Sequence, residues 1–369
     1  MRRAGRCVRR ANPEARVRRT TVMTTVLSRS PGRHVRAATW PSTTARPETD
    51  LATRYAPFPL DADARHFGLT TSVMRLGPGA VSVAVRHGRR TDSDTATILL
   101  HGAAGSWTTW TPLLRAAGHG DMAPTDSDLT DLIIPDLPGW GDSGLPTDTS
   151  ELTIETMAAT VADIARALGY SRWTIVGHSM GGLIALQLAA AETGATVSVG
   201  LISPTTFSVI DSVRHPVLRF GLLPGYTTLL QVMRMLCFAG TWGHALVVGF
   251  ARLRLLRALV SPLFRHPGRV PASVIAALAV EVRPRGFSLA SARAGSYDAV
   301  ASWSRIDCPV RAVTGDRDVF IAPSDRDRLS RVISDFSLVT LTGAGHFGHI
   351  ERPFDIVHTL GLPIGRQIR

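Results

Sequence analysis

Ser179 lies at the centre of the segment WTIVGHSMGGLIALQL, residues 173–188, and its surroundings could make its hydroxyl reactive. Residues 173–176 are apolar and rich in β-branched side chains, which is typical of a buried parallel strand. From Met180 onward the pattern is that of an almost wholly apolar helix, so Ser179 must occupy a tight strand-to-helix turn. The N–H groups at the start of such a helix, that of Met180 included, point at any oxyanion formed beside the serine.

Glycines flank Ser179 where a tight turn would bring backbone segments close together. Gly177 and Gly181 are the positions at which a side chain would collide with that backbone. The resulting G-x-S-x-G pattern resembles the nucleophile elbow of the α/β-hydrolases. A glycine-rich turn whose serine has no catalytic role has the same pattern. Other segments of the chain are needed to distinguish a catalytic serine from a structural one.

Three further segments resemble the same family. HGAAGSW follows an expected strand at residues 97–100, DLPGWGDS follows one at residues 132–134, and GAGHFGHIERP follows one at residues 336–341. With GHSMGG they make four independently placed signatures, and the resemblance covers roughly residues 65–365. This agreement argues against a serine that has no catalytic role.

The resemblance implies a Ser-Asp-His triad in the chain order Ser179, Asp318, His346. Asp318 is the second of two nearby aspartates in a loop after an expected strand, and the family pattern makes it the acid. Asp316 is then a loop carboxylate that caps a turn, and His349 lies near a helix start.

No carboxylate occurs in the segment SPTT, which follows the expected strand at residues 197–202. Some members of the family carry the triad acid there. The acid in this chain is therefore expected after the following strand, at residues 309–314.

The resemblance also implies an oxyanion hole made of the backbone N–H groups of Ala103 and Met180. In the family, the loop that supplies the first donor commonly begins His-Gly, and here His101 and Gly102 hold that place. Taken alone, this dipeptide would also fit a plain strand-to-helix connection.

The activity implied is that of a serine hydrolase that cleaves carboxylic esters of apolar substrates through an acyl-enzyme. His346 would take the proton of Ser179, and Asp318 would orient the imidazole. No cofactor or metal is expected. A serine at the elbow argues against haloalkane dehalogenases and epoxide hydrolases, which resemble this fold but use an aspartate there.

Two other reactions use the same triad in relatives: carbon–carbon bond hydrolysis of a dienoic ketone, and cofactor-free perhydrolysis of the haloperoxidase type. A different class is a catalytically silent binding or membrane-associated protein.

The predicted fold is that of an α/β-hydrolase, a mostly parallel sheet flanked by helices, opened by a hairpin within residues 70–86. The core is expected at residues 47–204 and 306–369. The resemblance implies that a helical cap at residues 205–305, after the sixth strand, lines the substrate pocket.

The cap is rich in apolar residues, so the sequence predicts apolar substrates of medium or larger size. These residues are Leu222, Leu223, Leu229, Leu230, Val232, Met233, Met235, Leu236, Phe238, Trp242, Leu246, Val247, Val248 and Phe250. Within the cap, residues 235–251 carry no formal charge but fall short of the roughly 20 residues that a membrane span needs, so a pair of lid helices is expected.

The formal net charge of +12 is concentrated near the N-terminus. Residues 1–46 hold twelve arginines and one glutamate, whereas the remainder is close to neutral. We expect a basic, disordered extension, with Met23 as an alternative start. No nucleic-acid partner is expected, and peripheral membrane contact would use this tail or the apolar cap.

Cys7, Cys237 and Cys308 are isolated and show neither a metal-ligand spacing nor a disulfide framework. No apolar segment of about 7 to 15 residues follows the arginines, as a secretory signal would require. The sequence therefore favours a cytoplasmic location.

Overall fold

The structure is a computed structural model, and it describes residues 55–77, 81–118, 129–217, 220–239, 249 and 256–362. Several predictions lie outside these residues and stay predictions. They concern the Arg-rich tail with Met23 and Cys7, the tip of the opening hairpin, and the larger part of the segment at residues 235–251.

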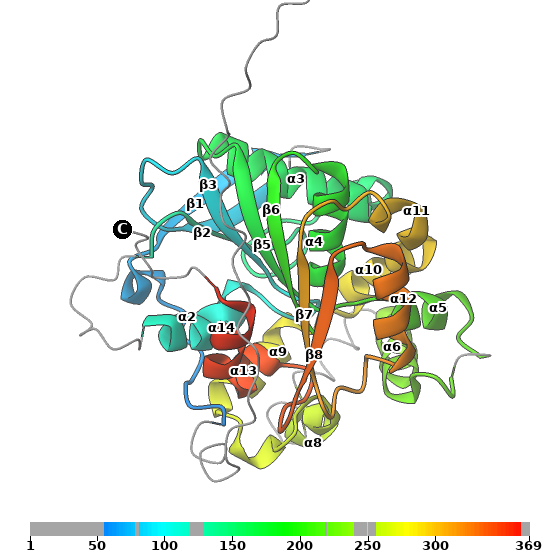
Figure 1. Cartoon of the computed structure of the whole chain (residues 1–369). Helices are drawn as coiled ribbons and strands as arrows, with labels where there is room; N and C mark the ends of the chain where they lie inside the picture. The colour runs from blue at the N-terminus through cyan, green and yellow to red at the C-terminus, as the bar shows by residue number, and fades with distance from the viewer. Residues whose placement is uncertain are drawn as a thin grey trace, which may run out of the picture. The chain divides into compact units, whose positions relative to one another are not determined.

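An eight-stranded sheet forms the centre of the described residues (Figure 1), with the strand order β1-β2-β4-β3-β5-β6-β7-β8. β2 pairs antiparallel with β1 and β4, and all other neighbours are parallel, which confirms the predicted fold class. The strands are β1 Thr70–Leu76, β2 Val81–His87, β3 Thr95–Leu100, β4 Leu132–Pro135, β5 Arg172–His178, β6 Thr196–Ile202, β7 Val310–Gly315 and β8 Phe336–Leu341.

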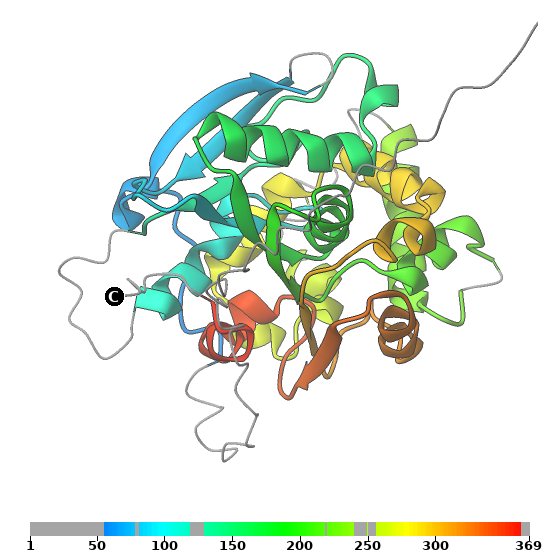
Figure 2. The ribbon, with the colours of Figure 1, turned by 45° about the horizontal axis from the view of Figure 1, so that its top comes forward.

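Helices cover both faces of the sheet, with α3 and α4 on one side and α2 and α14 on the other (Figures 1 and 2). Successive strand residues point to opposite faces. Ile98 and Ile175 thus join the core cluster under α3 and α4, whereas Leu99 and Val176 join the cluster under α2 and α14. The helices of the core are α2 Thr111–Gly118, α3 Ile154–Ala167, α4 Met180–Ala191, α12 Ser324–Val332, α13 Gly348–Glu351 and α14 Pro353–Leu360.

The helix that feeds the elbow strand begins as its sequence dictates. Thr153 is the N-cap of α3, and its hydroxyl accepts a hydrogen bond from Thr156 N–H while the Thr156 side chain accepts one from Thr153 N–H. This reciprocal capping box satisfies two N–H groups that the helix leaves unpaired.

Every described element between β6 and β7 is helical. We call this stretch, in which the sequence predicts a helical cap, the cap. Its helices are α5 Phe207–Arg214, α6 Pro224–Phe238, α8 Leu256–Val260, α9 Ala272–Glu281, α10 Pro284–Ser296 and α11 Ala299–Trp303.

Arginine side chains tie the cap to the loops of the core. Arg283 donates to the carbonyl oxygens of Gly139 and Gly141 at 3.0 and 2.9 Å, and Arg293 donates to those of Thr149 and Ser150 at 2.9 and 3.1 Å. Within the part of the chain that the structure describes, no helix is long and apolar enough to cross a membrane.

Candidate active site

Ser179 occupies the corner between β5 and α4, with φ 51° and ψ −118°. A non-glycine residue at such angles is strained, and it persists because the surroundings permit little else. A Cβ built on Gly181 would lie 2.1 Å from Leu100 O, and one on Gly177 would lie 2.4 Å from Gly181 O. The two glycines thus allow the close backbone approach that holds the serine in place.

The loop after β3 lies directly against this corner. A Cβ built on Gly102 would lie 2.9 Å from Ser179 Cβ, and Ala103 lines the same cavity as Ser179 and Met180. His101 pins the loop: its Nε2 accepts from Leu137 N–H at 2.9 Å, and its Nδ1–H donates to Gly102 O at 2.8 Å. Burial lowers the pKa of His101, which favours the neutral ring that this pattern requires.

Asp318 and His346 come together across two loops, after β7 and β8. The Nδ1–H of His346 donates to the Asp318 carboxylate at 3.0 and 3.2 Å, and the two side chains are only 4% and 1% exposed. Burial raises the pKa of Asp318, but the neighbouring His346 and its hydrogen bonds outweigh this effect, so the pKa lies below its ordinary value. The proton on Nδ1 leaves Nε2 of His346 as the acceptor.

His346 and Ser179 line one cavity, although no hydrogen bond joins their side chains among the described residues. Bonds of this kind are often long without substrate and tighten when it binds.

The backbone of His346 is fixed on both sides. Its N–H donates to Leu263 O of the cap at 2.8 Å, and its carbonyl oxygen accepts from His178 Nε2–H at 3.0 Å. Burial lowers the pKa of His178 well below its ordinary value, and the charges of His349 and His346 make a smaller contribution in the same direction. His178 is therefore a neutral hydrogen-bond donor that ties the elbow to the histidine loop.

Glu351 is a buried carboxylate that holds the same loop. It accepts from Gly345 N–H at 2.9 and 3.0 Å and from Phe347 N–H at 3.2 Å, the residues on either side of His346. It also accepts from Arg265 N–H of the cap at 2.8 Å and from Tyr55 O–H at 2.7 Å. Burial raises the pKa of Glu351 even though these bonds oppose the shift.

Asp316 and His349, the alternatives to Asp318 and His346, lie outside the Asp318–His346 pair. Asp316 is exposed, and its Oδ1 accepts from Gly343 N–H at 3.1 Å and Ala344 N–H at 3.2 Å, as expected of a turn-capping carboxylate. His349 lies in α13, fully buried, with its ring 4.4 Å from that of His178 and 4.8 Å from that of Trp110.

A cavity of about 520 Å³ lies between the core and the cap and includes Ser179, His346, Ala103 and Met180 in its wall. Most of its other lining is apolar and comes from the cap. The predicted cap residues in this wall are Leu229, Val232, Met233 and Leu236.

The remaining apolar residues predicted for the cap, as far as the structure describes them, do not line this cavity. Leu223 and Leu230 pack with Phe320, whereas Met235 and Phe238 are 71% and 93% exposed. The predicted residues from Trp242 to Phe250 lie outside the described part of the chain.

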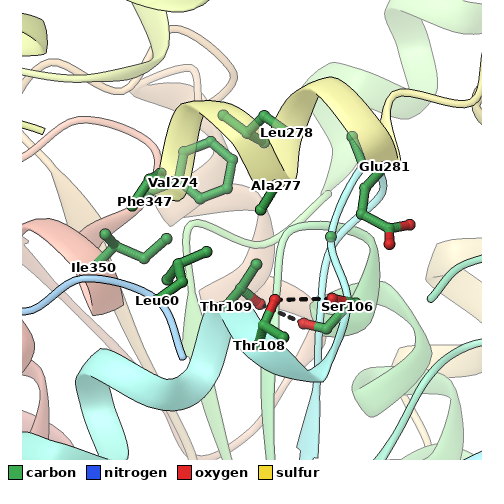
Figure 3. A pocket seen from close by; sticks show the side chains of 12 residues that line it. Leu60, Ser106, Thr108, Thr109, Val274, Ala277, Leu278, Glu281, Phe347 and Ile350 are labelled. Carbon is green, nitrogen blue, oxygen red and sulfur yellow. Dashed lines mark hydrogen bonds between the residues drawn. The ribbon is translucent and has the colours of Figure 1, made fainter. Parts of the chain in front are cut away.

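A second, much smaller cavity of about 10 Å³ lies behind the loop after β3, beneath α9 (Figure 3). This volume holds at most about one water molecule. The hydroxyls of Ser106, Thr108 and Thr109 are already hydrogen-bonded to neighbours within η3, Trp107–Trp110, and the residue before it. Glu281, at the end of α9, accepts from Gly141 N–H at 3.1 Å. We therefore interpret this space as a packing gap.

The sequence did not point to Glu351, His178 or Leu263 as supports of His346. Glu351 lies inside the segment GAGHFGHIERP and His178 inside GHSMGG, which is the only signal the sequence offers. Leu263 acts through its backbone carbonyl, so no residue type could have indicated its contact.

Comparison with known proteins places the chain in a family. The family model described as "Alpha/beta hydrolase family" matches residues 97–359, well over half of the chain. The chain is 28% identical over 122 residues to Epoxide hydrolase 4 of Mus musculus, and the match spans 32% of this chain and 31% of the mouse protein. The chain thus spans less than a third of that relative.

Solved structures have a similar fold. Epoxide hydrolase CorEH superposes with a TM-score of 0.59 at 19% identity, covering 79% of this chain and 97% of that one. A thermophilic esterase from Thermogutta terrifontis superposes with a TM-score of 0.56 at 18% identity, covering 79% and 97%. At these identities the likeness concerns the fold alone. On the family match and on the fold, this chain belongs to the alpha/beta hydrolase family.

Proposed function

We propose that the protein is a serine hydrolase that cleaves carboxylic esters of apolar substrates through an acyl-enzyme. One observation carries the proposal: the strained Ser179 and the Asp318-paired His346 open into the same apolar cavity.

In the proposed mechanism, Nε2 of His346 takes the hydroxyl proton as Ser179 Oγ attacks the ester carbonyl. Asp318 holds the imidazole by its Nδ1–H and stabilises the imidazolium. The oxyanion binds to the N–H groups of Ala103 and Met180. The alcohol leaves with the proton from His346, and a water activated by His346 then releases the acid from Ser179.

The nucleophile separates this chain from its relatives named as epoxide hydrolases. Epoxide hydrolases use an aspartate at the elbow, whereas this chain has Ser179 there. An ester carbonyl attacked by a hydroxyl forms an oxyanion that two N–H groups can bind, and the elbow and the loop after β3 supply such groups.

The size and apolar lining of the cavity favour a substrate with a sizeable apolar group. Each methylene moved from water into the cavity stabilises the bound substrate and transition state by about 0.8 kcal/mol. Extending an acyl chain by four carbons should therefore raise kcat/KM by up to about 10²-fold, until the pocket is full.

The test is a series of chromogenic esters of one alcohol, from acetyl to decanoyl, measured below any micelle concentration. The proposal predicts that kcat/KM rises with acyl length and then levels off. If acetyl is the best substrate and the rate falls with length, the cavity does not bind the acyl chain. A dienoic ketone in the same screen tests carbon–carbon bond hydrolysis, and faster turnover of the ketone would replace the ester assignment.

A further inference from the structure

Two hydroxyl groups meet in the mostly apolar cap wall of the cavity, which also contains Thr228. Tyr226 of α6 donates from its hydroxyl to Ser291 Oγ of α10 at 3.1 Å. Both residues are buried, and both line the cavity that contains Ser179.

Aromatic rings connect this pair to the catalytic side of the cavity. The Tyr226 ring contacts Phe320 edge-on, with centroids 5.5 Å apart, and Phe320 contacts His346 with centroids 4.6 Å apart. On the other side, the Phe287 ring lies 6.4 Å from that of Tyr226. Phe320 thus lies between the pair and His346, and the pair is on the cap side of Phe320.

The pair has hydrogen-bonding capacity left over. When the Tyr226 O–H donates to Ser291, the O–H of Ser291 remains as a donor, and among the described residues no acceptor for it is found. A wholly apolar ligand in contact with that hydroxyl would leave it buried and unpaired, which is unfavourable. An acceptor oxygen on the ligand would satisfy it.

The wall also limits what such an oxygen can belong to. Apart from His346, none of the residues that line the cavity in the described part of the chain has an ionisable acidic or basic side chain other than the phenol of Tyr226. Burial raises the pKa of that phenol to about 12, so it remains a neutral donor. The charge of Arg234 has only a minor effect on the pKa of Tyr226, and Arg234 does not line the cavity, so this wall suits an uncharged oxygen better than a charged one.

We propose that Tyr226 and Ser291 form a subsite for an uncharged oxygen, such as a keto, ether or hydroxyl group, carried on the apolar part of the substrate. This inference rests on the proposed ester hydrolysis and makes it narrower: the preferred substrate is an oxygen-bearing apolar ester, and a plain alkyl ester is a poorer one. Sites built to hydrogen-bond a substrate oxygen discriminate strongly against analogues that lack it.

The experiment compares decanoyl esters with esters of the same length in which one keto or ether oxygen is placed at successive positions. We expect one position to raise kcat/KM by about 10-fold or more over the plain ester. Ser291→Ala and Tyr226→Phe should bring that ratio close to 1. Ser288→Ala is the matched control: Ser288 lies one turn earlier in α10, outside the cavity wall, and its substitution should leave the ratio unchanged.

Binding to Ser179→Ala provides a readout that does not depend on turnover. The Kd ratio of plain to oxygen-bearing ester should show the same preference, and Ser291→Ala in that background should abolish it. Equal Kd values at every oxygen position, or a preference that survives both substitutions, would overturn the subsite. If the wild-type protein hydrolyses neither series, the proposed function fails, and the Kd ratio still decides the subsite.

A pair that only joined α6 to α10 would behave differently. Its removal would lower Tm and leave both ratios as they are, which would also overturn the proposal.

Discussion

The core and the cap form opposite walls of one cavity, and they are built in different ways. On the core wall, backbone groups fix the positions: Gly181 passes against Leu100 O, and the peptide groups around His346 are bonded to Leu263, His178 and Glu351. On the cap wall, side chains of α6, α8, α9 and α10 define the surface, and the Tyr226–Ser291 pair is set among mostly apolar groups.

The difference indicates where each property of the proposed hydrolase resides. Positions fixed by backbone cannot shift without breaking several hydrogen bonds or creating clashes, so they suit groups that need exact geometry for the reaction. Positions fixed by side-chain packing can change one residue at a time, so they suit substrate selection. Core variants should therefore alter kcat, whereas cap variants should alter the choice of substrate.

The largest expected effect is the difference in kcat between alanine substitutions of two serines, one on each wall of the cavity. Ser179→Ala should lower kcat by at least about 10⁴-fold with little change in Tm, because the attacking oxygen is lost while the turn remains. Ser291→Ala should change the ratio of kcat/KM between substrates far more than it changes kcat. Steady-state kinetics and thermal melts of both variants check this, and a similar loss of kcat in both would remove the distinction between the walls.

The second effect compares the two aspartates of one loop. Asp318→Asn should lower kcat by about 10³-fold or more, because an amide cannot hold the same histidine tautomer or stabilise its cation. Asp316→Asn should cost less than about 10-fold, since its side-chain oxygen can still accept from Gly343 and Ala344 N–H. Equal effects, or the reverse order, in single-turnover kinetics would move the acid to Asp316.

A third, smaller effect compares two buried glutamates. Glu351→Gln replaces one acceptor oxygen by an amide donor among groups that are all donors, so the loop of His346 should loosen. We expect kcat to fall by about 10-fold and the free energy of unfolding by about 2 kcal/mol.

Glu281→Gln in the cap is the matched control for that substitution. Glu281 accepts from the backbone N–H of Gly141 and pairs with Arg283 at 3.2 Å, and a glutamine oxygen can still accept from both, so kcat should stay within about 2-fold. A Glu281 variant that loses as much activity as the Glu351 variant would show that the cap fixes the catalytic geometry through more than its Leu263 and Arg265 backbone contacts.

The smallest effect is a dependence of stability on pH. Burial, and next the charge of His346, lowers the pKa of His349 to about 3, whereas the unfolded chain titrates near 6.5. Below pH 6.5 the unfolded state therefore binds a proton that the folded state does not, and stability falls as pH falls. His349→Phe should remove up to about 1.4 kcal/mol of this loss per pH unit.

Denaturant melts of wild type and His349→Phe between pH 7.5 and 5 check this slope. At pH 7.5 both rings are uncharged, so the comparison at that pH isolates the packing change. Parallel curves for the two proteins would show that the folded state accommodates the proton on His349.

The sequence predicted the core wall better than the cap wall, for a physical reason. A tight strand-to-helix turn requires glycine at Gly177 and Gly181 and leaves one place for Ser179, so residue types reveal the turn. The strands were also predictable, because their β-branched and apolar runs match β3 to β8 closely.

The groups that hold the loop of His346, and the proposed subsite of Tyr226 and Ser291, could not be predicted in this way. Leu263 O reaches the histidine loop from a segment far away in the chain, so its contact leaves no periodic pattern. Glu351 lies only four to six residues from the groups it binds, but its contacts depend on how the loop folds back, which residue types alone do not reveal. Similarly, Tyr226 and Ser291 stand on two helices whose apolar faces show no sign of the bond between them.

The most direct test of the central claim is to trap the acyl-enzyme. Wild-type protein is mixed with a chromogenic octanoyl ester, quenched in acid during the burst of alcohol release, and digested for mass spectrometry. We expect an octanoyl adduct on the peptide that contains Ser179, in an amount that matches the burst, and none in Ser179→Ala. An adduct on another residue, or full turnover with Ser179 replaced, would contradict the proposed mechanism.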